Sequence, residues 1–475
     1  MSLSPERLDA LLAQSAELAR LLLKSSQPPR ALTSEFLHGR KRFDSDEKAL
    51  ISAVAHHTLR CWRPAAAAVR SARGERDSYD DVDPRADAVL SPAVLGASIL
   101  LALPGTSPFN PPLPLPRELA SIADEAMLEN AGNRLLAENG NLTANALHSS
   151  AGDIMACPAP VGVRWSLPDW MTAAWRDAIP SFTDNEIVDI GAAFLHAAPL
   201  TLRVNTLRCS RERLLRLLGN EGIEAQPHPA LPDAVTVAER AALTETNLYR
   251  EGCFEVQDAG SQVIAMATGA QAGKRVYDVC AGGGGKTMQL AGMMNGSGLL
   301  LASDIERNKL RGLRQRASRL ELRSVRTLAV TPRGDAQDPS APLPDEASFD
   351  VVMVDAPCSG AGTLRRNPAL KWRLRPRAVE RLARRQLDIL RNGARYVRPG
   401  GILVYATCSL LPQENRQVIE HFLSSDESFM GDSLLSAFND QGFHPPISTD
   451  AFMWTVPPSL LDSDGYFVSR LLRCV

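Results

Sequence analysis

The spacing of apolar residues predicts helices through the first third of the chain. Leucines recur at helical spacing on one face of residues 8–25, and residues 45–62 show a second helical pattern after Ser45, a residue suited to an N-cap. Residues 103–116 are rich in proline and predict a loop. We therefore expect an all-α domain over residues 1–150.

The pattern changes after a predicted linker over residues 151–165. Residues 200–207 alternate between apolar and polar positions as a half-buried strand does, and residues 233–238 form a second such run. Between them, residues 210–222 read as a capped helix that ends on glycine. These elements predict a small α+β module over residues 166–252.

Short, nearly continuous apolar runs alternate with helical patterns over residues 253–475. Buried strands joined by helical crossovers predict a doubly wound parallel sheet, so we expect an α/β, Rossmann-like domain here. The predicted strands cover residues 275–280, 298–305, 325–330, 349–357 and 400–409, and the predicted helices cover residues 286–294, 306–320, 376–397 and 413–424.

The composition is that of a globular protein without a membrane segment or a metal cage. The chain has 475 residues, 44% of them hydrophobic and 22% charged, which predicts several domains. Its eight cysteines are scattered without a CxxC pair, so we expect neither a disulfide framework nor a metal site. The first residues include Glu6 and Asp9 where a signal peptide has basic residues, and no long uncharged apolar run follows. We expect a monomer in the cytoplasm.

The first predicted strand of the α/β domain ends in a glycine-rich loop. Four consecutive glycines allow the backbone to approach a ligand closely, and a helix N-terminus follows them. A nicotinamide fingerprint would need glycine at Thr287, and a phosphate-binding P-loop would need glycine at Cys280. Neither pattern is complete. The glycines are Gly282, Gly283, Gly284 and Gly285.

The second predicted strand favours a nucleoside site. It ends near Asp304, 20 residues after Gly284, where a carboxylate can accept hydrogen bonds from a ribose diol. Dinucleotide and S-adenosylmethionine (SAM) sites use such a carboxylate, whereas P-loop enzymes do not. Asp335, after the third strand, is a candidate acceptor for an adenine amine.

Two cysteines follow the fourth and fifth predicted strands. Cys358 and Cys408 each stand in a polar Cys-Ser context at adjacent positions of the ligand-binding edge. A thiolate that attacks carbon 6 of cytosine makes carbon 5 nucleophilic, and a second thiol can assist release. Asp355 lies beside Cys358 and could share a proton with the ring nitrogen. The residues alone do not decide which cysteine attacks.

Basic residues are concentrated after the first of these cysteines. Twelve Lys or Arg residues lie between Arg365 and Arg398, opposed only by Glu380 and Asp388, although the whole chain has a net charge of −2. Beside a base-modifying site, such a segment predicts phosphate contacts. The candidate RNA-binding residues are Arg365, Arg366, Lys371, Arg381, Arg384 and Arg385.

These motifs closely resemble those of the Sun/RsmB family of RNA cytosine-C5 methyltransferases. Residues 355–373 resemble the family's fourth motif and residues 406–415 its sixth, while residues 464–473 resemble its closing strand. Weaker similarity extends upstream to an RNA-recognition-like module and a NusB-like helical domain. The resemblance implies a SAM-dependent enzyme whose substrate is RNA, and it favours 16S ribosomal RNA as that substrate.

The resemblance also assigns roles to individual residues. It implies that Cys408 is the nucleophile and that Cys358 aids release of the product. One departure is clear: the family usually has Ala-Pro where this chain has Gly282-Gly283. The sequence leaves a tRNA methyltransferase and a non-catalytic RNA-binding assembly factor open as alternatives. The implied SAM contacts are Cys280, Ala281, Gly282, Gly283, Gly284, Gly285, Lys286, Asp304, Asp335 and Asp355.

Overall fold

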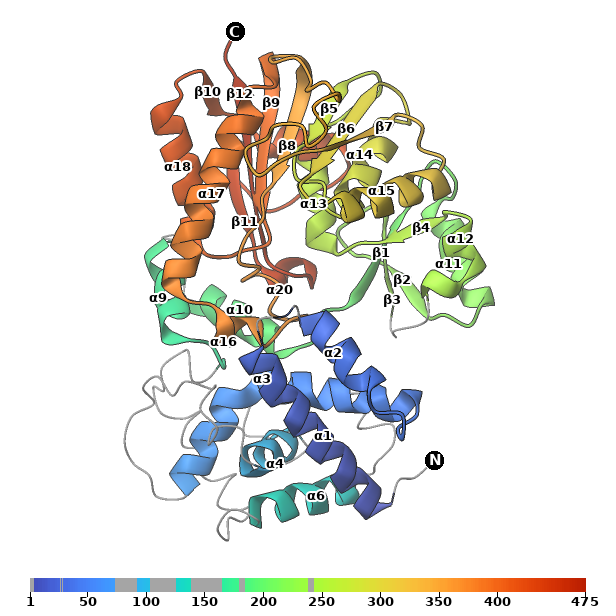
Figure 1. Cartoon of the computed structure of the whole chain (residues 1–475), viewed down its shortest axis with the longest axis vertical. Coiled ribbons are helices and arrows are strands. Elements are labelled where there is room, and N and C mark those ends of the chain that lie inside the picture. Colours follow the sequence, from blue (N-terminus) through green and yellow to red (C-terminus); the bar gives the residue numbers. More distant parts are fainter. Residues whose placement is uncertain are drawn as a thin grey trace. The chain divides into compact units, whose positions relative to one another are not determined.

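The structure, a computed structural model, folds into two compact units (Figure 1). The first unit comprises Met1–Ala197 and Thr363–Arg375, and the second comprises Ala198–Gly362 and Pro376–Val475. The predicted loop over residues 103–116 and all but the last residue of the predicted linker lie outside the described part of the chain. The structure describes residues 4–25, 27, 29–72, 92–102, 125–137, 165–178, 184–237 and 243–475.

The first unit is helical within its described residues, as the apolar spacing predicted. The side chain of Ser4 accepts a hydrogen bond from the amide of Arg7 and so caps the first helix, and most leucines of this helix are buried. The helices are α1 (Pro5–Lys24), α2 (Pro29–His38), α3 (Ser45–Ala72), α4 (Pro92–Leu100), α6 (Glu125–Ala137), α9 (Asp169–Ala178), α10 (Asp184–Leu195) and α16 (Leu370–Arg373).

Helix α16 belongs to this unit although it is far from the other helices in sequence. Nζ of Lys371 donates to the carbonyl of Arg60 over 3.0 Å, and the indole of Trp372 donates to the carbonyl of Leu59 over 3.2 Å. The ring of Trp372 also meets that of Trp62 edge-on, with 5.0 Å between the ring centroids. Thr363–Arg375 is therefore a structural part of the helical unit.

The second unit contains two sheets. The smaller one has the order β2-β3-β1-β4 and only antiparallel pairs, and it confirms the predicted small α+β module. Helices α9 and α10 fall within the predicted module boundary and are part of the first compact unit. The elements are β1 (Leu200–Val204), α11 (Arg211–Asn220), β2 (Ala225–Pro227), β3 (Ala234–Val237), η1 (Leu243–Glu245), α12 (Asn247–Arg250) and β4 (Phe254–Val256).

The larger sheet confirms the predicted Rossmann-like topology. Its order is β10-β12-β9-β8-β5-β6-β7, with β11 paired to β12. The five strands from β9 to β7 are parallel, and β12 is antiparallel to β9. The strands are β5 (Arg275–Asp278), β6 (Leu299–Asp304), β7 (Val325–Ala329), β8 (Phe349–Asp355), β9 (Val397–Thr407), β10 (Phe429–Gly431), β11 (Met453–Val456) and β12 (Tyr466–Arg473).

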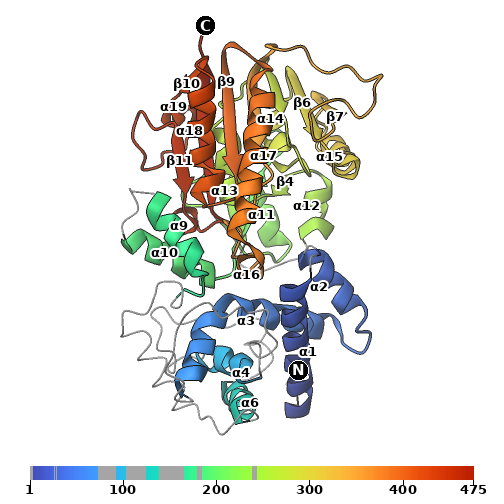
Figure 2. The same cartoon turned by 60° about the vertical axis from the view of Figure 1, so that its left-hand side comes forward.

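Helices cover both faces of the large sheet, as Figure 1 and Figure 2 show. Alternate strand residues point to opposite faces, so Met353 packs with α13, α14, α15 and α19, whereas Val352 packs with α17 and α18. No described helix is long and apolar enough to cross a membrane. The helices are α13 (Ala259–Met266), α14 (Gly285–Met293), α15 (Arg307–Arg319), α17 (Pro376–Ala394), α18 (Arg416–Ser425), α19 (Leu434–Asp440) and α20 (Pro458–Leu461), with η2 at Pro412–Glu414.

Buried Lys371 should make the stability of the helical unit depend on pH. Burial lowers its pKa from 10.5 to about 7, so between these values the unfolded chain binds more protons than the folded one. The free energy of unfolding should therefore rise from pH 7 to pH 9, by about 2 kcal/mol relative to Lys371→Met, which lacks this group. Urea unfolding of both proteins at the two pH values measures this difference. Parallel pH profiles would contradict it.

Candidate active site

The glycine-rich loop connects β5 to α14 at the carboxyl edge of the large sheet. Gly282 and Gly284 have φ values of +54° and +83°, which residues with a Cβ rarely adopt. A Cβ at Gly284 would lie 2.6 Å from Cγ of Leu313 in α15, whereas nothing lies within 4 Å of a Cβ at Gly282 or Gly285. The loop thus packs tightly on α15 on one side and leaves open space for a ligand on the other.

Asp304, at the end of β6, holds this loop. Its Oδ2 accepts from the amide of Gly282 over 2.9 Å, and its Oδ1 accepts from the amide of Glu306 over 2.8 Å. The residue is buried, and each carboxylate oxygen keeps lone pairs beyond the one that the backbone uses. Asp304 therefore orients the loop as well as being a candidate ribose acceptor.

An ion pair joins the glycine-rich loop to the next strand of the sheet. Nζ of Lys286, in the first turn of α14, lies 2.7 Å from Oδ2 of Asp355, the last residue of β8. Burial alone would lower the pKa of Lys286, but the charge and hydrogen bond of Asp355 raise it above its usual value. Strands β5 and β8 flank the point where the strand order reverses, which is where α/β sheets bind ligands.

Another carboxyl group lies next to the loop and was not singled out from the sequence. Asp278 ends β5 and accepts a hydrogen bond from the hydroxyl of Thr287 over 2.7 Å. Burial raises the pKa of Asp278 to about 7, and its Oδ1 has no partner within the described residues. A buried strand-end carboxyl is indistinguishable from an ordinary core position in a sequence pattern.

The two predicted cysteines lie together at the ends of β8 and β9. Their Sγ atoms are 3.3 Å apart, and both side chains are half-buried free thiols. The interaction with Cys408 and then burial raise the pKa of Cys358 well above its usual value. Two thiols this close do not ionise independently, and Cys358 keeps its proton at neutral pH.

Glu414 joins the two segments that carry these cysteines. Its carboxylate is fully buried, and it accepts from the amide of Ser359 over 2.7 Å and from the hydroxyl of Ser409 over 2.7 Å. The hydroxyl of Ser359 and the amide of Gln386 in α17 complete its contacts. Because each serine follows one cysteine, this single carboxylate binds the residue next to each thiol. Nothing in the sequence pattern singles out Glu414.

Asp335 lies in the loop that follows β7. Its side chain is exposed, and Oδ2 lies 3.5 Å from the hydroxyl of Thr331. In the same loop, the amide of Gln337 donates to the carbonyls of Ile305 and Val330, each over 2.7 Å. This amide, which the sequence analysis also missed, ties the loops after β6 and β7 together.

The predicted RNA-contacting residues divide into two groups. Arg365 and Lys371 are buried in the helical unit, where they bind backbone carbonyls, so they are not placed to contact phosphates. Counting charges along the chain could not reveal this burial. The exposed members are Arg366, before α16, and Arg381, Arg384 and Arg385 on α17.

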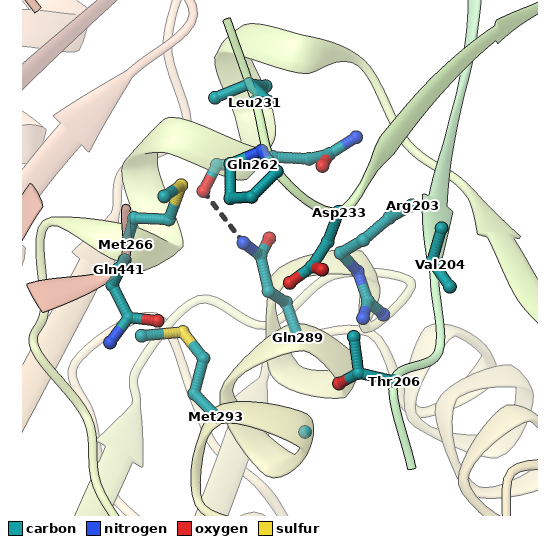
Figure 3. Close-up of a pocket in the computed structure, with 12 residues that line it drawn as sticks. Arg203, Val204, Thr206, Leu231, Asp233, Gln262, Met266, Gln289, Met293 and Gln441 are labelled. Carbon is teal, nitrogen blue, oxygen red and sulfur yellow. Dashed lines mark hydrogen bonds between the residues drawn. The ribbon is translucent and has the colours of Figure 1, made fainter. Parts of the chain in front are cut away.

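A separate pocket of about 120 Å³ lies among β1, α13 and α14 (Figure 3). Arg203 is buried at its wall and donates from Nε to Oε1 of Gln257 over 2.8 Å. Burial lowers the pKa of Arg203 to about 10. The amide of Gln289 donates to the carbonyl of Gln262 beside it. None of the predicted site residues lines this pocket, and no cluster of metal-binding side chains occurs in the described chain.

Comparisons with known proteins agree with this arrangement. The family described as "16S rRNA methyltransferase RsmB/F" matches residues 265–472, and the family described as "Methyltr_RsmF/B-like, ferredoxin-like domain" matches residues 167–244. The probable ribosomal RNA small subunit methyltransferase B of Bacillus subtilis is 32% identical over 65% of this chain and 66% of its own. The ribosomal RNA small subunit methyltransferase B of Salmonella newport is 36% identical over 65% of this chain and 67% of its own.

A solved structure supports the fold. The crystal structure of a methyltransferase homologue from Pyrococcus horikoshii covers 67% of this chain and 99% of its own, with a TM-score of 0.54 and 24% identity.

Replacing Glu414 should change the titration of the neighbouring thiol. Glu414→Gln removes a negative charge that raises the pKa of Cys358 and weakens the contacts that hold the thiols together. Both effects lower the pKa of Cys358, so its alkylation at pH 8 should become severalfold faster. Peptide mass spectrometry after iodoacetamide labelling over a pH series measures this.

The matched control is Glu420→Gln, which removes an exposed carboxylate paired with Arg416 on α18. Its labelling profile should equal that of the wild type. If Glu414→Gln leaves the Cys358 profile unchanged, the carboxylate does not govern the thiol pair.

Proposed function

Because the chain belongs to the 16S rRNA methyltransferase RsmB/F family and is a SAM-dependent RNA methyltransferase, we propose that it methylates carbon 5 of a cytosine in 16S ribosomal RNA. The reaction passes through a covalent bond between Cys408 and the base. The observation that carries this proposal is the 3.3 Å separation of two thiols at adjacent strand ends of the ligand-binding edge. The enzyme acts as a monomer in the cytoplasm.

The glycine-rich loop and the carboxylates around it hold SAM. The open side of the loop at Gly282 and Gly285 leaves room for the ligand, and the carboxylate of Asp304 faces the same edge. Asp335, at the next loop, contacts the adenine. Bound SAM supplies a methyl group on a positively charged sulfur, which leaves as a neutral thioether. The carboxylate of Asp355 and the other acidic groups near the loop favour binding of the positively charged sulfur.

The two thiols divide the chemistry between them. Sγ of Cys408 attacks carbon 6 of the cytosine, which makes carbon 5 nucleophilic towards the methyl group. After methyl transfer, the thiolate of Cys358 accepts the proton from carbon 5, the bond between Sγ of Cys408 and carbon 6 breaks with its electron pair returning to the sulfur, and the aromatic ring is restored. Cys358 assists this release. A thiol that keeps its proton is a poor nucleophile, so the raised pKa of Cys358 supports Cys408 as the attacking group.

Asp355 acts on the ring nitrogen of the base. Lys286 binds its Oδ2, which fixes the carboxylate at the end of β8 and leaves Oδ1 to share a proton as negative charge develops on the ring. A charged Lys286 beside it keeps this group in place throughout the reaction.

Helix α17 carries the proposed RNA surface. The helix runs from the carboxyl edge of the sheet towards the start of β9, so its first turns lie nearest the active site. Burial raises the pKa of Cys280 in the glycine-rich loop, and the charge of Arg385 partly opposes this rise. Arg381 and Arg385 share one face at i and i+4, with Arg384 beside them.

Exchanging the two cysteines for alanine should have opposite consequences. Cys408→Ala should abolish methylation and any covalent complex, because no thiolate attacks carbon 6. Cys358→Ala should instead trap the enzyme on RNA, because release is impaired. Denaturing gels of each variant incubated with SAM and 16S RNA detect the adduct.

An adduct with Cys408→Ala and none with Cys358→Ala would reverse the assignment. Bisulfite sequencing of total RNA from a deletion strain distinguishes the wider alternatives. Loss of a 5-methylcytosine from tRNA would replace the proposed substrate, and no loss from any RNA would indicate a non-catalytic assembly factor.

Neutralising the α17 surface should weaken RNA binding and reduce its dependence on salt. Changing Arg381, Arg384 and Arg385 together to Gln removes up to three phosphate contacts, each of which contributes a slope of roughly −0.7 to −0.9 in log K against log salt. SAM affinity should stay the same. Filter binding at several salt concentrations measures the slope.

The same helix and its neighbouring strand offer a matched control. Arg391, Arg395 and Arg398 are also exposed, but they lie towards the opposite edge of the sheet, bound to Ser425, Glu346 and Asp350. Their triple Gln variant should bind RNA as the wild type does. Equal slopes for both triple variants would show that α17 is merely solvated.

A further inference from the structure

The consecutive glycines of the loop have no side chains to fix its shape, so other groups must hold it. Within the described residues, the amide of Gly282 donates to Asp304 and the amide of Gly284 donates to the carbonyl of Ala281. The third contact comes from α15, where Nη1 of Arg316 donates to the carbonyl of Gly283 over 2.6 Å. Arg316 is therefore a clamp on the middle of the loop.

Arg316 is itself held by a buried carboxylate. Glu255 of β4 is 1% exposed, and its Oε2 accepts from Nε of Arg316 over 3.1 Å and also from Nη2. Arg319 of the same helix binds the other oxygen of Glu255, and its guanidinium lies over the ring of Tyr249, 3.9 Å from the centroid. A planar guanidinium bound in this way has a fixed orientation, so Nη1 of Arg316 is directed at the carbonyl of Gly283.

The clamp matters because glycine loses more backbone entropy on ordering than any other residue. Four glycines in succession make the loss of backbone entropy large when the free loop becomes ordered. If that ordering occurs only when a ligand binds, the entropy loss reduces the affinity of the ligand. A bond to the Gly283 carbonyl fixes the peptide between the two left-handed glycines before the ligand arrives. Restricting the free loop in this way raises the affinity for whatever binds its open side.

We propose that Arg316, oriented by Glu255, is a positioning residue for SAM binding in this chain. The proposal rests on the assignment of the glycine-rich loop to SAM made under the proposed function. Because Glu255 lies in β4, it also makes the order of the cofactor loop depend on the four-stranded sheet. Arg316 belongs to a run of eight basic residues from Arg307 to Arg326, but two of them, Arg316 and Arg319, turn inward to Glu255.

The first test is SAM binding by calorimetry with the full chain and no RNA. Arg316→Met keeps most of the side chain's length but removes the donors, and SAM should bind about tenfold more weakly, as expected for the loss of a charge-assisted hydrogen bond. The matched control is Arg314→Met on the exposed side of α15, whose guanidinium binds the hydroxyl of Thr327. Its SAM affinity should equal that of the wild type.

A second readout separates loop positioning from general damage. Without SAM, amide hydrogen exchange over residues 279–286 should be faster in Arg316→Met than in the wild type, with the core strands unchanged. Gly283→Ala should then rescue binding in part. Gly283 does not have a positive φ, and a Cβ there would meet only Nη1 of Arg316, at 3.7 Å. Alanine restricts the free loop, so the double variant should regain about two- to fivefold in affinity.

Each outcome decides the proposal. Unchanged SAM affinity in Arg316→Met, or an equal loss in Arg314→Met, overturns it. A loss of affinity without faster loop exchange, or without rescue by Gly283→Ala, also overturns it, because the arginine would then act on SAM or on the fold directly. If Arg316→Met does not fold, Arg316→Lys replaces it, and wild-type SAM affinity in that variant counts against the guanidinium clamp. A wild-type chain that binds SAM but leaves 16S RNA unmethylated contradicts the proposed function and not this one.

Discussion

The carboxyl ends of parallel strands in the large sheet meet at one edge, and this constraint places every group of the candidate active site. Strand β5 delivers the glycine-rich loop, β6 delivers Asp304, β8 delivers Asp355 and β9 leads into Cys408. None of these residues is near the others in sequence. The strand order reverses between β5 and β8, and the Lys286–Asp355 ion pair crosses that reversal. A cofactor and a base can therefore approach the same edge from neighbouring loops.

Buried carboxylates convert this common edge into a defined geometry. Glu414 and Glu255 are almost fully buried, and each accepts several hydrogen bonds from groups on separate segments. An ionised carboxylate in a low-dielectric interior is stable only when its lone pairs are satisfied, so its partners are held as firmly as the group itself. Glu414 fixes the segments that carry the two thiols, and Glu255 fixes the arginine that binds the glycine-rich loop.

Local patterns carried the prediction of strands, helices and both cysteines because each of these is encoded over a few residues. Strand β8 occupies residues 349–355 and was predicted over 349–357, and α15 occupies 307–319 where 306–320 was predicted. What local patterns could not give were contacts between distant segments. The sequence places Glu414 within the motif of the second cysteine but does not show that it binds Ser359, and it does not show that Arg316 binds the glycine-rich loop.

The basic segment after Cys358 also shows what local patterns could not predict, because the sequence does not tell which of its charges are buried. A count of charges treats Lys371 and Arg381 alike, yet one is buried against α3 and the other is exposed on α17. The difference arises because residues 363–375 leave the α/β unit and pack in the helical one. Burying an ammonium group is costly, and the lowered pKa of Lys371 reflects that cost. Trp372 beside it contributes a large apolar surface and a satisfied indole N–H, which offset the cost.

The electrostatic surroundings of the thiol pair explain why two cysteines can have different roles at 3.3 Å. Glu414 raises the pKa of Cys358, and so does the neighbouring thiol, so a second negative charge at this position is strongly disfavoured once the first has formed. The pair therefore carries at most one negative charge near neutral pH. That restriction is useful for a reaction in which one sulfur must attack as a thiolate while its neighbour remains protonated.

The protonation of the site also changes at each covalent step. Formation of the bond to carbon 6 neutralises the attacking sulfur and removes one of the causes that hold the proton on Cys358. The second cysteine thus becomes easier to deprotonate only after the first has reacted, which is the order that removal of the proton from carbon 5 requires.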